Sequence, residues 1–98
     1  MPLESKIWIF TKSIVDLERD DYGVYELLDV SDKILYVGYG KIRCSLMTHF
    51  ADGKEPVGNA FNFSVEYTWD EVKAKKQHKD ELDKFYEKNK KYPRYNKQ

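Results

Sequence analysis

Two β-rich segments lie close together in the first half of this 98-residue sequence. Residues 23–28 (GVYELL) and 33–39 (KILYVGY) are rich in the branched and aromatic side chains that favour strands. The four residues between them, DVSD, have the composition of a turn. The pattern predicts an antiparallel β-hairpin, and a chain of this length can bury only one core around it.

A third strand is predicted later in the chain, where apolar and polar residues alternate. The apolar positions are Phe61, Phe63, Val65 and Tyr67, and the polar positions between them are Asn62, Ser64 and Glu66. Successive side chains of a strand point to opposite faces of the sheet. The alternation therefore predicts a strand with one buried face.

Two helices are predicted on either side of this strand. Ile42, Leu46 and Phe50 recur every four residues, which predicts an amphipathic helix over residues 41–50. Asp70 is a favourable N-cap for a long polar helix that extends to about residue 89. Pro93 stops this helix because proline cannot continue the helical hydrogen bonds.

The first 20 residues are predicted to form an N-terminal extension. The short apolar run at residues 6–10 indicates a short strand or an extended arm, and Ser13 is placed to cap a helix that reaches Asp16 and Leu17. The whole chain, residues 1–98, is then a single α+β domain. We expect a small three-stranded, mainly antiparallel sheet flanked by helices, with the N-terminal arm and helix added.

Charge and composition exclude several classes of function. The chain has 17 basic and 17 acidic residues, so it is not a general polycation, but residues 70–98 carry ten basic and six acidic residues. This basic end is either a solvated helix face or a phosphate-binding stripe. One cysteine and two histidines exclude a disulfide framework and a four-ligand Cys/His zinc site. No apolar run approaches the roughly 20 residues of a membrane span, so we expect no membrane partner and a cytoplasmic location.

Three short motifs resemble the signature of the GIY-YIG nuclease superfamily. Gly23-Val-Tyr25 is followed after ten residues by Tyr36-Val-Gly38, and the chain closes with Pro93-Arg-Tyr-Asn96. The resemblance covers residues 21–97. It implies that the two triplets lie on neighbouring antiparallel strands, followed by a helix, a third strand and a further helix.

The resemblance also implies a chemistry, which is metal-assisted hydrolysis of a phosphodiester. Tyr25 and Tyr36 match the motif tyrosines, whose hydroxyls can relay a proton to or from an attacking water. An arginine would neutralise the phosphoryl oxygens and a glutamate would hold one Mg²⁺ or Mn²⁺ ion. The simpler interpretation is that both tyrosines are ordinary half-buried residues of a sheet.

The arginine position is where the sequence departs from this pattern. Leu46 and His49 match the residues that flank the family's arginine, so the arginine position falls on Ser45. Arg43 lies two residues earlier, about 200° around a helix, and acts as the catalytic residue only if the helix has another register. Lys41 shares the helix face of Ser45 and could supply a cation.

The metal-binding carboxylate has two candidates on the last predicted helix. The resemblance places this carboxylate on the helix before the closing proline, at a distance that fits Asp83 directly and Glu81 if the helix has one extra turn. Of the two, Glu81 is favoured as the metal ligand and catalytic carboxylate. A lone carboxylate binds Mg²⁺ loosely, with water and phosphate oxygens as the other ligands. The alternative is that both residues belong to a solvated helix face.

These observations favour a degenerate nuclease-like domain that binds nucleic acid or a protein with little or no cleavage, and therefore needs no metal. The candidate contacts to nucleic acid are Lys41, Arg43, His49, Lys84 and Asn96. The first alternative is an active metal-dependent endonuclease that hydrolyses DNA with Mg²⁺ or Mn²⁺. The second is an unrelated small protein-interaction domain.

Overall fold

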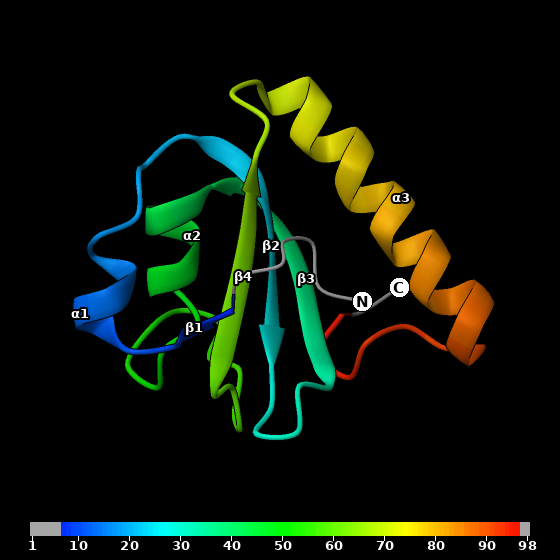
Figure 1. The fold of residues 1–98 in the computed structure, drawn as a ribbon, viewed down its shortest axis with the longest axis horizontal. Coiled ribbons are helices and arrows are strands. Elements are labelled where there is room, and N and C mark those ends of the chain that lie inside the picture. Colours follow the sequence, from blue (N-terminus) through cyan, green and yellow to red (C-terminus); the bar gives the residue numbers. More distant parts are fainter. Residues whose placement is uncertain (1–6, 97–98) are drawn as a thin grey trace.

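A four-stranded antiparallel sheet runs through the part of the chain that the computed structural model describes, residues 7–96 (Figure 1). The strands are β1 (Trp8–Ile9), β2 (Tyr22–Leu28), β3 (Ile34–Lys41) and β4 (Asn62–Tyr67). Their order across the sheet is β1-β4-β2-β3, so the predicted hairpin and third strand are confirmed. The expected three strands become four because the N-terminal arm pairs with β4, with Trp8 opposite Phe63.

The β2–β3 hairpin carries the two triplets in register. Tyr25 lies opposite Gly38 and Leu27 lies opposite Tyr36, so the triplets are on neighbouring antiparallel strands as expected. The register then shifts, because Leu28 pairs with Ile34 and leaves Leu35 as an extra residue. This bulge allows Leu35 and Tyr36, which are consecutive in sequence, both to pack against the same core cluster.

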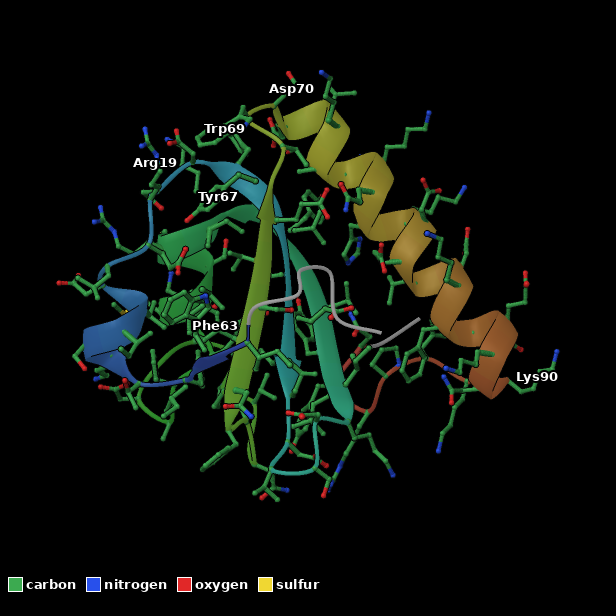
Figure 2. The ribbon with its side chains drawn as sticks, in the orientation of Figure 1. Arg19, Phe63, Tyr67, Trp69, Asp70 and Lys90 are labelled. Atoms are coloured by element: carbon green, nitrogen blue, oxygen red, sulfur yellow. The ribbon has the colours of Figure 1, made fainter. Side chains whose placement is uncertain are left out.

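Helices cover both faces of the sheet. On one face lie α1 (Lys12–Val15) and α2 (Ile42–Met47), and on the other lies the long helix α3 (Glu71–Asn89), as Figure 1 shows. The first face holds a cluster that includes Leu27, Phe63, Ile42 and Leu46. Phe63 points to the side of α1 and α2 in Figure 2.

The second face holds a smaller cluster of Val24, Val37, Ala74 and Leu82 beneath α3. The prediction of one buried face for the third strand is therefore wrong. Ser64, on the face that was expected to be solvated, has no exposed surface because α3 covers that side. Phe61, expected in the core, precedes β4 and is 49% exposed.

The structure also corrects the first helix. The chain leaves the helix after Val15, and the N-cap is Thr11, whose Oγ1 accepts a hydrogen bond from the Ile14 backbone N–H, whereas Ser13 lies inside the helix. The short α1 and the strand Trp8–Ile9 are integral to the fold, because Val15 is fully buried in the core. By contrast, Asp70 caps α3 as predicted, through a 2.9 Å bond from the Lys73 N–H.

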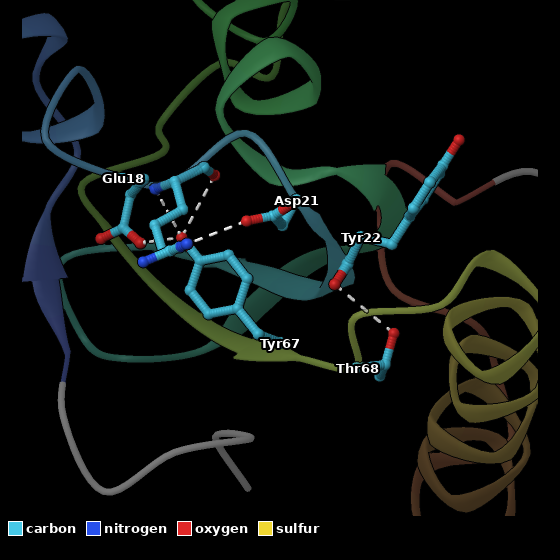
Figure 3. A network of polar contacts seen from close by, with 6 residues as sticks. Glu18, Asp21, Tyr22, Tyr67 and Thr68 are labelled. Carbon is cyan, nitrogen blue, oxygen red and sulfur yellow. Dashed lines mark hydrogen bonds and ion pairs between the residues drawn. The ribbon is translucent and has the colours of Figure 1, made fainter.

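Glu18 and Arg19, which follow α1, bind Tyr67 of β4 (Figure 3). The Tyr67 hydroxyl donates to Glu18 Oε1 at 2.6 Å and accepts from the Arg19 backbone N–H at 2.9 Å. The Arg19 guanidinium lies 5.3 Å from the ring centroid of Trp69, which stacks on Tyr67. Burial and the Glu18 carboxylate both raise the pKa of Tyr67, so this hydroxyl keeps its proton.

The C-terminal segment completes the open edge of β3. The side-chain amide of Asn96 accepts from the Val37 backbone N–H at 2.8 Å and donates to the Val37 carbonyl at 2.9 Å. The Tyr95 backbone N–H donates to the carbonyl of Leu35 at 2.9 Å. Asn96 thus pairs with β3 much as a residue of a neighbouring strand would.

We expect Asn96→Ala to lower the free energy of unfolding by about 1–3 kcal/mol, because it leaves both polar groups of the Val37 peptide without this partner. Urea denaturation measures the change. Asn89→Ala is the matched control, since Asn89 makes one exposed bond to the Phe85 carbonyl. Equal stabilities of the two variants would show that the Asn96 contact contributes nothing.

Candidate functional site

The two motif tyrosines lie side by side on the face of the sheet that α2 covers. Their ring centroids are 6.1 Å apart, and the planes are tilted by 40°. Tyr25, from the central strand β2, is 2% exposed, whereas Tyr36, from the edge strand β3, is half-buried. Tyr36 is therefore the partly exposed ring of this pair.

The glycines of the triplets are needed because other groups approach them closely. A Cβ atom at Gly38 would collide with the ring of Tyr25, which lies across β3 at this point. A Cβ atom at Gly23 would meet the carbonyl oxygen of Glu66 on β4 at 2.5 Å. The Gly-x-Tyr and Tyr-x-Gly pattern therefore follows from packing as well as from any catalytic role.

His49 connects the tyrosines to the loop after α2. Its Nε2 atom lies 2.7 Å from the Tyr25 hydroxyl, and its Nδ1 atom lies 2.8 Å from the backbone carbonyl oxygen of Glu55. A carbonyl oxygen only accepts, so Nδ1 carries the proton and the bare Nε2 accepts from the Tyr25 hydroxyl. The Glu55 backbone thus selects the tautomer of His49 that can receive the tyrosine proton.

Burial keeps this hydrogen-bonded chain neutral. It raises the pKa of Tyr25 well above its usual value of 10, with smaller contributions from Tyr36 and the Glu55 carboxylate. It also raises the pKa of Tyr36 and lowers that of His49. Near neutral pH, Tyr25 is therefore a hydrogen-bond donor and His49 is an uncharged acceptor.

A pocket of about 280 Å³ opens above these residues. We call it the tyrosine pocket, and the residues of chemical interest in its lining are Tyr25, Tyr36, Ser45, His49, Lys54 and Glu55. Ser45, the position predicted for the family's arginine, thus lines the same pocket as both tyrosines.

The two basic residues predicted near the start of α2 lie elsewhere. Lys41 is exposed and its Nζ atom lies 5.8 Å from the ring centroid of Tyr22, and Arg43 is exposed as well. Among the described residues that line the tyrosine pocket, Lys54 is the basic side chain. The pocket therefore has a lysine from a loop rather than an arginine from the helix.

Sequence reasoning missed Lys54 and Glu55. Both lie in the loop between α2 and β4, which has no hydrophobic periodicity and matches no motif. The Val57 N–H bonds to the His49 carbonyl at 3.0 Å and the Glu55 N–H bonds to the Thr48 carbonyl at 2.9 Å, which folds the loop back over α2. The one sequence signal near this loop is His49, which precedes it and matches a residue of the family pattern.

A larger cleft of about 590 Å³ continues along the edge of β3, and we call it the edge cleft. The edge cleft is lined by Tyr36, His49 and Glu55, by Asn96, which was predicted as a nucleic-acid contact, and by His78, which was not. His78, from α3, lies with its Nε2 atom 3.1 Å from the Val37 carbonyl oxygen and therefore donates there. His78 is thus the residue of α3 that faces the edge cleft.

The predicted carboxylates lie in a different place. Glu81 and Lys84 line a small cleft with Glu26 and Val37, on the α3 face of the sheet, and Asp83 is exposed. The pKa of Glu81 is raised mainly by burial. The structure therefore does not bring Glu81 or Asp83 into the tyrosine pocket.

The donor atoms for a metal ion are correspondingly few. Within residues 7–96, no three side chains of His, Cys, Asp or Glu are grouped so that they could hold a metal ion. Glu55 is the carboxylate among the described lining residues of the tyrosine pocket. A Mg²⁺ ion held by one carboxylate keeps most of its water ligands, so the pocket fits such an ion only as a weak site.

The sheet order, the flanking helices and the paired tyrosines define a GIY-YIG-like fold. The structure is similar to the crystal structure of the GIY-YIG N-terminal endonuclease domain of UvrC from Thermotoga maritima bound to its catalytic divalent cation, magnesium. The TM-score is 0.69, the match covers 88% of this chain and 94% of that chain, and the sequences are 16% identical. At this level of identity the similarity establishes the fold alone.

The sequence belongs to the family described as Domain of unknown function (DUF7508), whose model matches residues 1–88. No curated protein matches the chain. Among the described helices, none is both long and apolar enough to cross a membrane. The cytoplasmic location stays a prediction.

We expect the free energy of unfolding to fall as the pH is lowered from about 7 to 5. Folding lowers the pKa of His49 and of His78 from the usual 6.5, so the unfolded chain protonates first on acidification and protons favour unfolding. The loss is about 1.4 kcal/mol for each unit by which folding lowers a pKa. Urea denaturation at several pH values measures it.

The matched variants are His49→Gln and His78→Gln, alone and together. Each should reduce the dependence on pH between about 7 and 5, whatever it does to stability at neutral pH. A double variant with the same pH dependence as the unmodified chain would contradict this assignment.

Proposed function

We propose that this chain is a degenerate GIY-YIG-like domain that binds nucleic acid at the tyrosine pocket and has little or no nuclease activity. The observation that carries the proposal is that Ser45 lines that pocket together with Tyr25 and Tyr36. A serine hydroxyl cannot neutralise the charge that develops on a phosphoryl oxygen. Loss of one positioned charge donor typically costs about 10²- to 10³-fold in rate.

The groups that remain are better suited to holding a phosphate than to cleaving one. The exposed Lys54 can pair with a phosphate oxygen, and the Ser45 hydroxyl and the half-buried Tyr36 can donate hydrogen bonds. The Tyr25 hydroxyl donates to His49 within the core and is hardly accessible to a substrate. Because the chain has no net charge, we expect modest affinity that depends strongly on salt.

A second candidate function is an active metal-dependent endonuclease with a rebuilt site. The observation in its favour is that Lys54 and Glu55 line the same pocket as the tyrosines. Lys54 would replace the arginine, and Glu55 would hold a Mg²⁺ or Mn²⁺ ion that lowers the pKa of a bound water. The exposed loop position of both residues makes this arrangement less well ordered than a site built on a helix.

We expect Lys54→Glu to weaken binding of a labelled DNA duplex or branched DNA at about 50 mM salt, where phosphate contacts are strong. The slope of log affinity against log salt should become smaller by about 1, because one phosphate contact is lost. Fluorescence anisotropy measures both quantities. Lys88→Glu makes the same charge change on the α3 face and should have little effect, since Lys88 lines the cleft with Glu26 and Glu81.

Absence of DNA binding at high micromolar concentrations would contradict the nucleic-acid proposal and favour a protein partner. Equal effects of Lys54→Glu and Lys88→Glu would show that only overall charge matters and that the tyrosine pocket is not the binding site.

We expect the unmodified chain to cleave plasmid or branched DNA poorly or not at all with Mg²⁺ or Mn²⁺, and Ser45→Arg to raise any trace activity. The arginine would enter the pocket beside the two tyrosines and supply the missing charge. Ser45→Lys is the control for charge without the planar fork of arginine. A gel assay for plasmid nicking measures the activity.

Efficient cleavage by the unmodified chain would contradict the degenerate assignment. If that cleavage were lost in Lys54→Ala and in Glu55→Gln, the rebuilt site would be the correct one. If it were lost in Arg43→Ala instead, the catalytic arginine would be Arg43.

A further inference from the structure

A second cleft adjoins the edge cleft on the surface of α3. It has a volume of about 460 Å³, and we call it the lysine cleft, lined by Tyr39, Val72, Lys75, Lys76, His78 and Lys79. Tyr39 and His78 also line the edge cleft, so the two hollows share a wall. Tyr36 in turn lines both the edge cleft and the tyrosine pocket. A continuous surface therefore leads from the tyrosine pocket past the edge of β3 to α3.

The middle of this surface is aromatic. The rings of Tyr39 and His78 lie with their centroids 4.8 Å apart, and both side chains are half-buried. Tyr36 and Tyr95 add two further half-buried rings to the edge cleft. Such rings present flat faces on which a planar group can stack.

Hydrogen bonds and packing hold these rings in place. The His78 ring is fixed by its bond to the Val37 carbonyl at 3.1 Å, and the backbone at Tyr95 is held by the bond from its N–H to the Leu35 carbonyl. Tyr39 packs against the cluster of Val24 and Val37 beneath α3.

The far end of the surface is basic. Lys75, Lys76 and Lys79 are all exposed, and the positions 75 and 79 are one helical turn apart on α3. Among the described residues that line the lysine cleft, none is acidic, whereas Glu55 lines the edge cleft at the end near His49. The surface therefore offers cations on α3 and aromatic rings at the edge of β3.

We propose that this surface binds a single strand of nucleic acid, with bases stacked on Tyr39 and its aromatic neighbours and phosphates paired with Lys75, Lys76 and Lys79. The inference rests on the proposed function and names the form of nucleic acid that the chain prefers. In a duplex the faces of the bases are covered by their neighbours, so aromatic side chains can stack only on bases outside a duplex. A positively charged groove with stacking side chains is the usual arrangement for single strands.

The test compares labelled single-stranded DNA and RNA of about 16 nucleotides with a duplex of the same length, by fluorescence anisotropy at about 50 mM salt. A single strand of either sugar should bind more tightly than the duplex. An abasic strand of equal length keeps the phosphates but offers no bases to stack, and it should bind about 5- to 100-fold more weakly than the normal strand.

Variants of Tyr39 test the stacking contact itself. Tyr39→Leu keeps an apolar side chain against Val24 and Val37 but has no aromatic face, and it should weaken single-strand binding by a similar factor, about 5- to 100-fold. Tyr39→Phe should keep the affinity. Neither change should alter the weaker binding of the abasic strand by more than about twofold, a difference within the ordinary effect of a surface substitution.

Variants of α3 test the phosphate contacts. Lys75→Glu with Lys79→Glu should reduce the affinity for all strands and make the salt dependence less steep by about 2. Lys88→Glu with Lys91→Glu makes the same charge change further along the chain and should reduce the affinity much less. Circular dichroism confirms that each variant is folded.

Two results would overturn the inference. If the duplex binds at least as tightly as the single strands and Tyr39→Leu has no effect, the single-strand groove is wrong while nucleic-acid binding at the tyrosine pocket stands. If no nucleic acid binds at all, both the inference and the proposed function fail.

Discussion

The site depends on the close contact between the ring of Tyr25 and the backbone of Gly38. Because Gly38 has no side chain, the ring can lie across β3 and its hydroxyl can reach His49 at 2.7 Å. The same packing sets the neighbouring Tyr36 ring 6.1 Å away and leaves it half-buried at the edge of the sheet. A single missing Cβ atom thus connects the packing of the core to the shape of the tyrosine pocket.

Much of the fold could be predicted because its signals are local. The hairpin, the alternating strand and the Asp70 cap of α3 each depend on a few adjacent residues, and the structure confirms them. The first helix was mispredicted because tertiary contacts outweighed the local helix signals. Ser13 is a good cap by residue type, but Thr11 takes that role, the helix ends after Val15, and Glu18 and Arg19 bind Tyr67 on β4.

The site was only partly predictable for the same reason. The resemblance to the GIY-YIG signature singled out Tyr25, Tyr36, Ser45 and His49, and the structure brings these four residues together in one pocket. Lys54 and Glu55 reach the tyrosine pocket through a loop, and His78 reaches the edge cleft through a helix that packs against β3. Spacing in sequence carries no information about such contacts. The two predicted carboxylates on α3 depend on the rotation of a long helix, and here that rotation turns His78 rather than Glu81 toward the edge cleft.

The backbone of Val37 binds two separate parts of the chain, because its carbonyl accepts from His78 of α3 and both its N–H and its carbonyl pair with Asn96. Two residues that line the edge cleft, His78 and Asn96, are therefore both hydrogen-bonded to the same residue of β3. If a nucleic-acid strand binds in this cleft as proposed, it would meet the side chains of His78 and Asn96 already held by hydrogen bonds. Association then carries a smaller entropic penalty, because less of the protein has to be ordered at the moment of contact. This rigidity would let a small domain of zero net charge discriminate between ligands of the same charge by their shape.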